Sequence, residues 1–152
     1  MTEQQNQQAA LPGAAPFIVV VDDSPTIRVV LELTLKGEGC DGVSFATGLA
    51  ALQWLKSPQG RVPDLIILDL VIPRLDGYAL MRHLKRNPAL AAVPVIIITG
   101  HDDTVSHLKM HLTGATDYLI KPFTVQQIIA TARHYLDRPT LILPNAPVGH
   151  AR

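Results

Sequence analysis

The sequence has little cysteine, no net charge and no long apolar run, and each shortage excludes a class of protein. Cys40 is the only cysteine among 152 residues, so neither an intrachain disulfide nor a cysteine-based metal cluster can form. The 13 basic and 13 acidic residues cancel, which leaves no overall field for nucleic acid or an anionic membrane. The apolar runs are far shorter than the roughly 20 residues of a membrane helix, and no signal peptide precedes them. We expect a soluble cytoplasmic protein that binds neither nucleic acid nor membrane.

The two ends of the chain differ in composition from its middle. Residues 1–16 are rich in Gln and Ala and nearly uncharged, which predicts a flexible N-terminal tail. Residues 138–152 carry Pro139, Pro144 and Pro147 and show no helical period, so a C-terminal tail is expected there. Residues 17–137 then form one domain of ordinary size, and the hydrophobic content of 47% is enough to fill its core.

Between the tails, short β-rich runs alternate with helix-like segments. Runs at residues 17–21, 65–68 and 95–98 are continuously apolar, which suits strands buried on both faces of a parallel sheet. Weaker strands are expected over residues 42–46 and 116–120. Five such βα units with right-handed crossovers predict an α/β fold, a doubly wound five-stranded parallel sheet in a three-layer sandwich.

Helix start signals follow several of these strands. Ser24 can cap a helix whose first position is Pro25, where the missing N–H costs nothing. The pair Asp76-Gly77 opens another helix, and residues 124–127 read as a capping box for the last one. The apolar faces expected to pack on the sheet are Ile27, Val30 and Leu31 in the first helix and Val125, Ile128, Ile129 and Ala132 in the last.

Polar side chains stand where the strands end: Asp22 and Asp23, then Asp69, then Thr99, then Lys121. Taken singly, each is better explained as a helix cap, a turn residue or a strand end. Together they meet at the carboxyl edge of the sheet, where three crowded carboxylates call for a hard cation such as Mg²⁺. An ammonium and a hydroxyl beside them suit a phosphoryl group, so the set favours phosphoryl transfer. Nucleotide binding is disfavoured, because no glycine-rich loop follows the first strand.

Four motifs in order carry a family resemblance. They are Val-Asp-Asp-Ser at residues 21–24, Asp-Leu-Val-Ile-Pro-Arg-Leu-Asp-Gly at 69–77, Thr-Gly at 99–100 and Lys-Pro-Phe at 121–123. With them, residues 17–136 resemble the receiver domains of bacterial two-component response regulators. The resemblance implies the flavodoxin-like (βα)5 fold and a phosphoprotein of a phosphorelay signal transduction system.

The resemblance also implies a role for each site residue. Asp69 matches the phosphoacceptor, and Lys121 matches the lysine that contacts the phosphoryl group. Asp23 matches the acid that binds Mg²⁺ directly, with Asp22 acting mainly through water. The main-chain carbonyl of Val71 is the further metal ligand that the family implies.

Switch residues are implied as well. Thr99 matches the hydroxyl residue that moves toward the phosphoryl group, and Tyr118 matches the aromatic residue that swings inward behind it. The bond from Lys121 to Pro122 is often cis in this family. His101 could reach attacking water and tune the lifetime of the acyl phosphate, although an ordinary loop histidine is the simpler interpretation.

We therefore predict a stand-alone receiver that accepts a phosphoryl group from a sensor histidine kinase or chemotaxis-type kinase and catalyses no other reaction. Its output would be a switched contact with a downstream protein, through the face built by the fourth helix, fifth strand and fifth helix. The chain is expected as a monomer or a phosphorylation-dependent dimer. A weaker resemblance points to chemotaxis and twitching-motility regulators.

Other hypotheses stay open at this stage. A pseudo-receiver that only binds partners and a phosphorelay intermediate both fit the same fold. A Mg²⁺-dependent phosphohydrolase is disfavoured, because such enzymes place the nucleophile after the first strand with another Asp two residues on. A flavin-binding fold is disfavoured too, because no phosphate loop rich in Ser, Thr and Gly follows that strand.

Overall fold

The computed structural model describes residues 14–70, 76–100 and 112–136. One sheet holds five parallel strands in the order β2-β1-β3-β4-β5, which confirms the predicted doubly wound topology. The strands are β1 (Phe17–Val21), β2 (Asp41–Phe45), β3 (Leu65–Asp69), β4 (Val95–Thr99) and β5 (Asp117–Ile120). The helices of the described segments are α2 (Pro25–Gly37), α3 (Gly48–Lys56), α4 (Gly77–Arg86) and α6 (Val125–Leu136).

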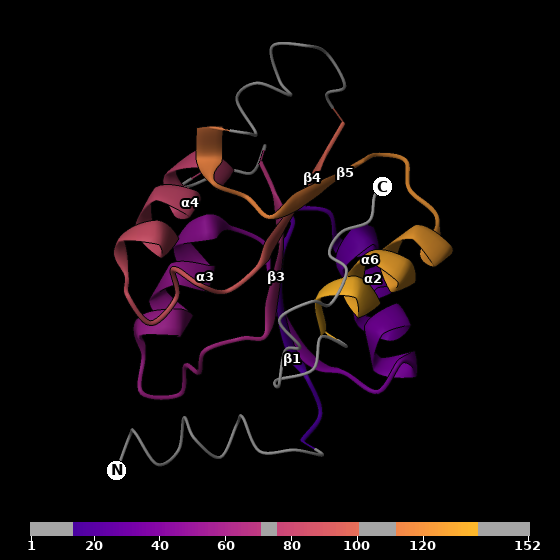
Figure 1. Ribbon diagram of the computed structural model, residues 1–152, viewed down its shortest axis with the longest axis horizontal. Coiled ribbons are helices and arrows are strands. Elements are labelled where there is room, and N and C mark those ends of the chain that lie inside the picture. The colour runs from indigo at the N-terminus through magenta and orange to yellow at the C-terminus, as the bar shows by residue number, and fades with distance from the viewer. Residues whose placement is uncertain (1–13, 71–75, 101–111, 137–152) are drawn as a thin grey trace, which may run out of the picture.

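The sheet is the middle layer of a three-layer sandwich (Figure 1). Helices α3 and α4 cover one face, and α2 and α6 cover the other. Every residue of β1, β3 and β4 is buried, whereas the edge strands β2 and β5 are partly exposed. Continuous apolar runs therefore fall on the three central strands, because both faces of those strands lie against helices.

The strand ends agree with the predicted ends to within one residue. β3 includes Asp69 and β4 includes Thr99, so both polar residues stand at the last position of a strand. The helix expected between β4 and β5 falls mainly on residues 101–111, which lie outside the described residues. Within the described part of the chain, no helix is long and apolar enough to span a bilayer.

The predicted helix caps are confirmed by hydrogen bonds. Ser24 Oγ accepts from the main-chain N–H of Ile27 at 3.2 Å, and Pro25 occupies the first helical position of α2. Asp76 Oδ1 accepts from the N–H of Ala79 at 2.8 Å. In the capping box, the Thr124 N–H donates to the Gln127 side chain at 2.8 Å, and the Gln127 N–H donates to the Thr124 hydroxyl at 3.0 Å.

Two residues predicted to pack on the sheet do not do so. Val30 is 38% exposed, because the buried stripe of α2 runs through Leu31 and Leu35 and Val30 lies to one side of it. Val125 is 44% exposed, because it is the first residue of α6, which contacts the core through Ile128 and Ala132.

Candidate functional site

Strand register brings the polar strand ends together. Val21 of β1 pairs with Leu68 of β3, so the residues that follow, Asp22 and Asp69, lie side by side at the carboxyl edge of the sheet. On the other side of β3, Thr99 ends β4 and pairs with Ile120 of β5, which is the residue before Lys121. The sheet thus brings four polar side chains from four different strands to one edge.

The Lys121 side chain connects two of the carboxylates. Its Nζ atom lies 2.9 Å from Asp69 Oδ2 and 3.1 Å from Asp22 Oδ2. Asp22 is fully buried and Asp69 is 5% exposed, so the attraction acts in a region with little water to screen it. Burial lowers the pKa of the Lys121 ammonium, but the hydrogen bond and charge of Asp69, and then those of Asp22, outweigh burial and raise that pKa above its ordinary value of 10.5.

Main-chain hydrogen bonds fix Asp22 from both sides. Its Oδ1 atom accepts from the Ser24 N–H at 2.8 Å, and its own N–H donates to the carbonyl of Phe45 at 3.0 Å. The guanidinium of Arg28 donates to the Asp22 carbonyl at 2.7 Å. A buried carboxylate held this way cannot turn away from its neighbours. The part played by Arg28 was missed from the sequence, because a helix residue that reaches back six positions leaves no periodic signal.

The site fits a divalent cation. Asp22, Asp23 and Asp69 each offer a carboxylate oxygen, and these oxygens all lie within 4.8 Å of one another. Asp22 Oδ2 is buried, and the Lys121 ammonium lies 3.1 Å from it. Asp23 is exposed and faces solvent at the mouth of the site. Mg²⁺ in proteins is usually held by one or two carboxylates together with water and phosphate oxygens, and the exposed side of this cluster leaves room for them.

The two proposed switch residues share one face of the sheet. Thr99 follows Ile97 by two positions, so both side chains point to the α3–α4 side. Tyr118 pairs with Ile97 in the register of β4 and β5 and packs half-buried against the same core. Thr99 is 1% exposed. Thr99 and Tyr118 therefore lie on a single face of the sheet.

Other predicted features divide between described and undescribed residues. The peptide bond between Lys121 and Pro122 is cis, as the resemblance implied. A Cβ atom added to Gly100 would meet nothing within 4 Å, so there is open space directly after Thr99. Val71 and His101 lie outside the described residues.

Comparison with known proteins agrees with the fold. Residues 18–133 match the family described as the response regulator receiver domain. Protein PilG of Pseudomonas aeruginosa is 33% identical over 119 residues, which cover 78% of this chain and 86% of PilG. The DNA-binding transcriptional regulator NtrC of Escherichia coli K12 is 37% identical over 138 residues, and the match covers 86% of this chain but only 28% of NtrC.

Among solved structures, the chemotaxis protein CheY4 of Vibrio cholerae superposes with a TM-score of 0.73 at 25% identity. The match covers 81% of this chain and 100% of the CheY4 chain. The chain thus spans most of PilG and all of the CheY4 chain, but little more than a quarter of NtrC.

Proposed function

We propose, since the chain belongs to the response regulator receiver family, that Asp69 accepts a phosphoryl group in a Mg²⁺-dependent reaction. One observation carries this proposal: the nearly buried Asp69 carboxylate lies 2.9 Å from the Lys121 ammonium and next to two further carboxylates. Three carboxylates this close together repel one another unless cations compensate their charge. An acid that must take up a phosphoryl group needs a cation on each side of it, and this site offers Lys121 and a set of ligands for a metal.

Phosphoryl transfer would form one bond at Asp69 and break one bond on the donor. An oxygen of Asp69 attacks the phosphorus of a phosphohistidine, the P–N bond breaks, and the histidine nitrogen keeps the electron pair and takes a proton from water. The product is an acyl phosphate on Asp69, which water later hydrolyses. The Lys121 ammonium, which already lies beside Asp69, then pairs with the new phosphoryl oxygens.

A cation at the site would be held by Asp22, Asp23, Asp69 and the carbonyl of Val71. Mg²⁺, when bound, neutralises charge on the oxygens of the transferring group. Asp22 contributes as a rigid buried anion, because Ser24 and the β2 carbonyl of Phe45 hold it in place. Asp23 contributes from the exposed side, where a solvated ion enters.

The switch would run through Thr99 and Tyr118. The phosphoryl group draws the Thr99 hydroxyl toward itself, and the space that Thr99 leaves is filled by the half-buried Tyr118 ring. The two residues share a face of the sheet, which supports this path. The change then shifts a two-state equilibrium at the face formed by the segment after β4, by β5 and by α6.

We propose a sensor histidine kinase or a chemotaxis-type kinase as the phosphoryl donor. The output would be a switched contact with a downstream protein. The likeness to PilG and to the chemotaxis protein CheY4 supports a role in chemotaxis or motility. His101, directly after Gly100, is proposed to tune the lifetime of the acyl phosphate. The dephosphorylation rate of His101→Ala tests that role, and an unchanged rate would contradict it.

Intact mass after incubation with acetyl phosphate and Mg²⁺ tests the main proposal. The wild-type chain should gain one phosphoryl mass, and the gain should vanish with EDTA and in Asp69→Ala. Asp41→Asn is the matched control, because Asp41 is exposed and begins β2, at the end of the strand away from the carboxyl edge of the sheet. This variant should gain the phosphoryl mass as wild type does. A folded wild-type chain that gains no mass would instead favour a pseudo-receiver that acts only by binding.

A further inference from the structure

A groove lies on the α4 side of the molecule, away from the proposed phosphoryl site. It has a volume of about 410 Å³ and is lined by Tyr78, Met81 and Arg82 of α4 together with Leu112 and Thr113. Met81 is buried and forms part of the floor, whereas Leu112 is 78% exposed. Of the large apolar side chains that the structure describes, Leu112 is the most exposed, and its exposure costs free energy that a partner could recover.

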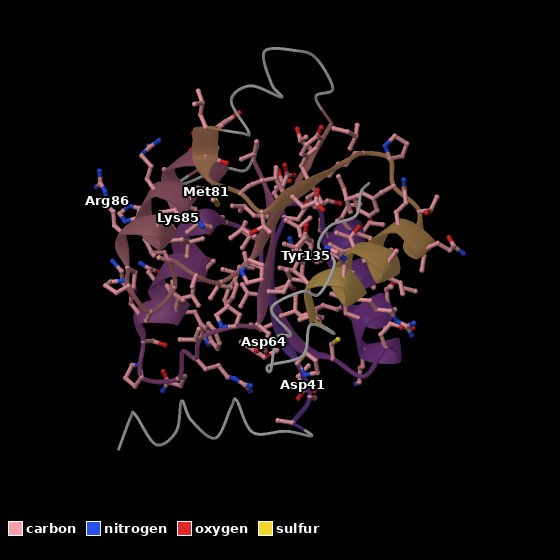
Figure 2. All side chains as sticks on the ribbon, in the orientation of Figure 1. Asp41, Asp64, Met81, Lys85, Arg86 and Tyr135 are labelled. Carbon is pink, nitrogen blue, oxygen red and sulfur yellow. The ribbon has the colours of Figure 1, made fainter. Side chains whose placement is uncertain are left out.

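Arg82 lines this groove, and Arg86 lies one helical turn further along α4. Arg82 and Arg86 are four residues apart and both exposed, so their guanidinium groups project from the same face of the helix. Figure 2 shows Arg86 directed outward from α4, with Met81 and Lys85 closer to the sheet. Like charges at this spacing destabilise a helix.

The spans of the two helices in this layer contain no acidic residue, and Asp76 stands just before α4 as its cap. Helices α3 and α4 contain Lys56, Arg82, Lys85 and Arg86 and no Asp or Glu. The ion pairs found among the described residues involve Lys121 and Arg133, and neither Arg82 nor Arg86 takes part. Lys85 differs from the two arginines, because its Nζ donates to the carbonyl of Ala91 at 3.2 Å.

We propose that this groove is a docking site for an acidic, amphipathic segment of a partner protein. Carboxylates of the segment would pair with Arg82 and Arg86, since a guanidinium binds a carboxylate through two parallel hydrogen bonds. An apolar side chain of the segment would enter the groove over Met81 and cover Leu112. Asp69 does not line this groove, and the proposed contacts involve no phosphoryl group.

Charge and size select this occupant over the alternatives. Nucleic acid binding typically uses about 6–10 phosphate contacts, and two arginines beside an apolar groove supply too few. Two cations and a single exposed leucine give no stable anchor on an anionic bilayer. A protein segment uses both the cations and the apolar lining.

The test is a selection of random peptides of roughly 16 residues, about four helical turns, on the unphosphorylated whole chain. The selected peptides should combine Asp or Glu with Leu, Phe or Trp. Affinity of the best synthetic peptide should fall about tenfold or more in the Arg82→Glu/Arg86→Glu variant, a change of about 1.4 kcal/mol or more. The same peptide with its acids replaced by lysine should bind that variant better than it binds wild type.

Two further variants keep the result unambiguous. Lys36→Glu reverses an exposed cation on α2, in the opposite layer, and should leave peptide affinity unchanged. Leu112→Ser keeps both arginines and should weaken binding through the loss of apolar contact. Peptides without an acidic bias, or an affinity indifferent to the arginine reversal in a folded variant, would overturn the proposal. So would duplex DNA or phosphatidylserine vesicles that bind through these arginines when no acidic peptide does.

Discussion

The Nζ atom of Lys121 lies 2.9 Å from Oδ2 of Asp69, although the two residues are 52 positions apart in the chain. The same ammonium lies 3.1 Å from Asp22, so a single cation stabilises two carboxylates that are almost fully withdrawn from water. Losing that charge leaves both acids without their counterion. The lysine proposed to contact the phosphoryl group therefore has a measurable structural role before any phosphoryl group arrives.

The pH dependence of stability tests this role in the metal-free protein. The folded-state pKa of Lys121 lies above the ordinary value of 10.5, because Asp69 and Asp22 outweigh the effect of burial. The stabilisation is fully present below the unfolded pKa and is lost as pH rises through the folded pKa. Urea unfolding in EDTA, from about pH 8 to about pH 11, should show wild type losing more stability than Lys121→Met over the alkaline end. Parallel losses in the two proteins would contradict the coupling.

Magnesium should stabilise the fold through the carboxylate cluster. A ligand that binds the folded state alone adds about 2.7 kcal/mol at a concentration 100 times its Kd. The melting temperature of wild type should therefore rise with Mg²⁺, and Asp23→Asn should flatten that rise because it removes the exposed ligand of the cluster. Asp41→Asn, an exposed acid outside the cluster, should respond as wild type does. Equal responses in all three proteins would place the ion elsewhere.

How far the sequence predicted this site depends on the range of the interaction. Strand runs and helix caps are local patterns, and Ser24, Asp76 and Thr124 all cap as predicted. The general rule that sites lie beyond the carboxyl ends of parallel strands was enough to select Asp69 and Lys121 as neighbours.

What the sequence could not predict depends on the packing between elements. The exposure of Val30 follows from how α2 is rotated against the sheet. The sequence shows that Val30 and Leu31 are both apolar, but not that only Leu31 is buried. The hydrogen bond from Arg28 to Asp22 depends on the turn between β1 and α2. The groove beside Arg82 exists because α4 lies against residues 112 and 113, which are far away in sequence.

A contact of this long-range kind joins α6 to the start of β5. The Tyr135 hydroxyl donates to Asp117 Oδ2 at 2.8 Å, while Asp117 Oδ1 accepts from the N–H of Tyr118 at 2.7 Å. Tyr135→Phe removes one donor and keeps the ring, so we expect a loss of about 1 kcal/mol in the free energy of unfolding. A double-mutant cycle with Asp117→Ala, followed by urea unfolding, isolates the pair, and a coupling energy near zero would contradict a direct bond.

Gly77, the first residue of α4, lies against the backbone of Asp69 and Leu70. A Cβ atom at this position would lie 2.5 Å from Leu70 Cα and 2.7 Å from the Asp69 carbonyl oxygen, and both are backbone atoms that cannot move aside cheaply. Alanine ordinarily favours a helix over glycine, but Gly77→Ala should lower the free energy of unfolding by about 1–3 kcal/mol, because overpacking outweighs propensity. Gly100→Ala is the matched control: its Cβ would meet nothing within 4 Å, so its stability should stay within about 0.5 kcal/mol of wild type. Urea unfolding of the two variants separates the effects, and equal stabilities would show that the backbone around Asp69 yields without cost.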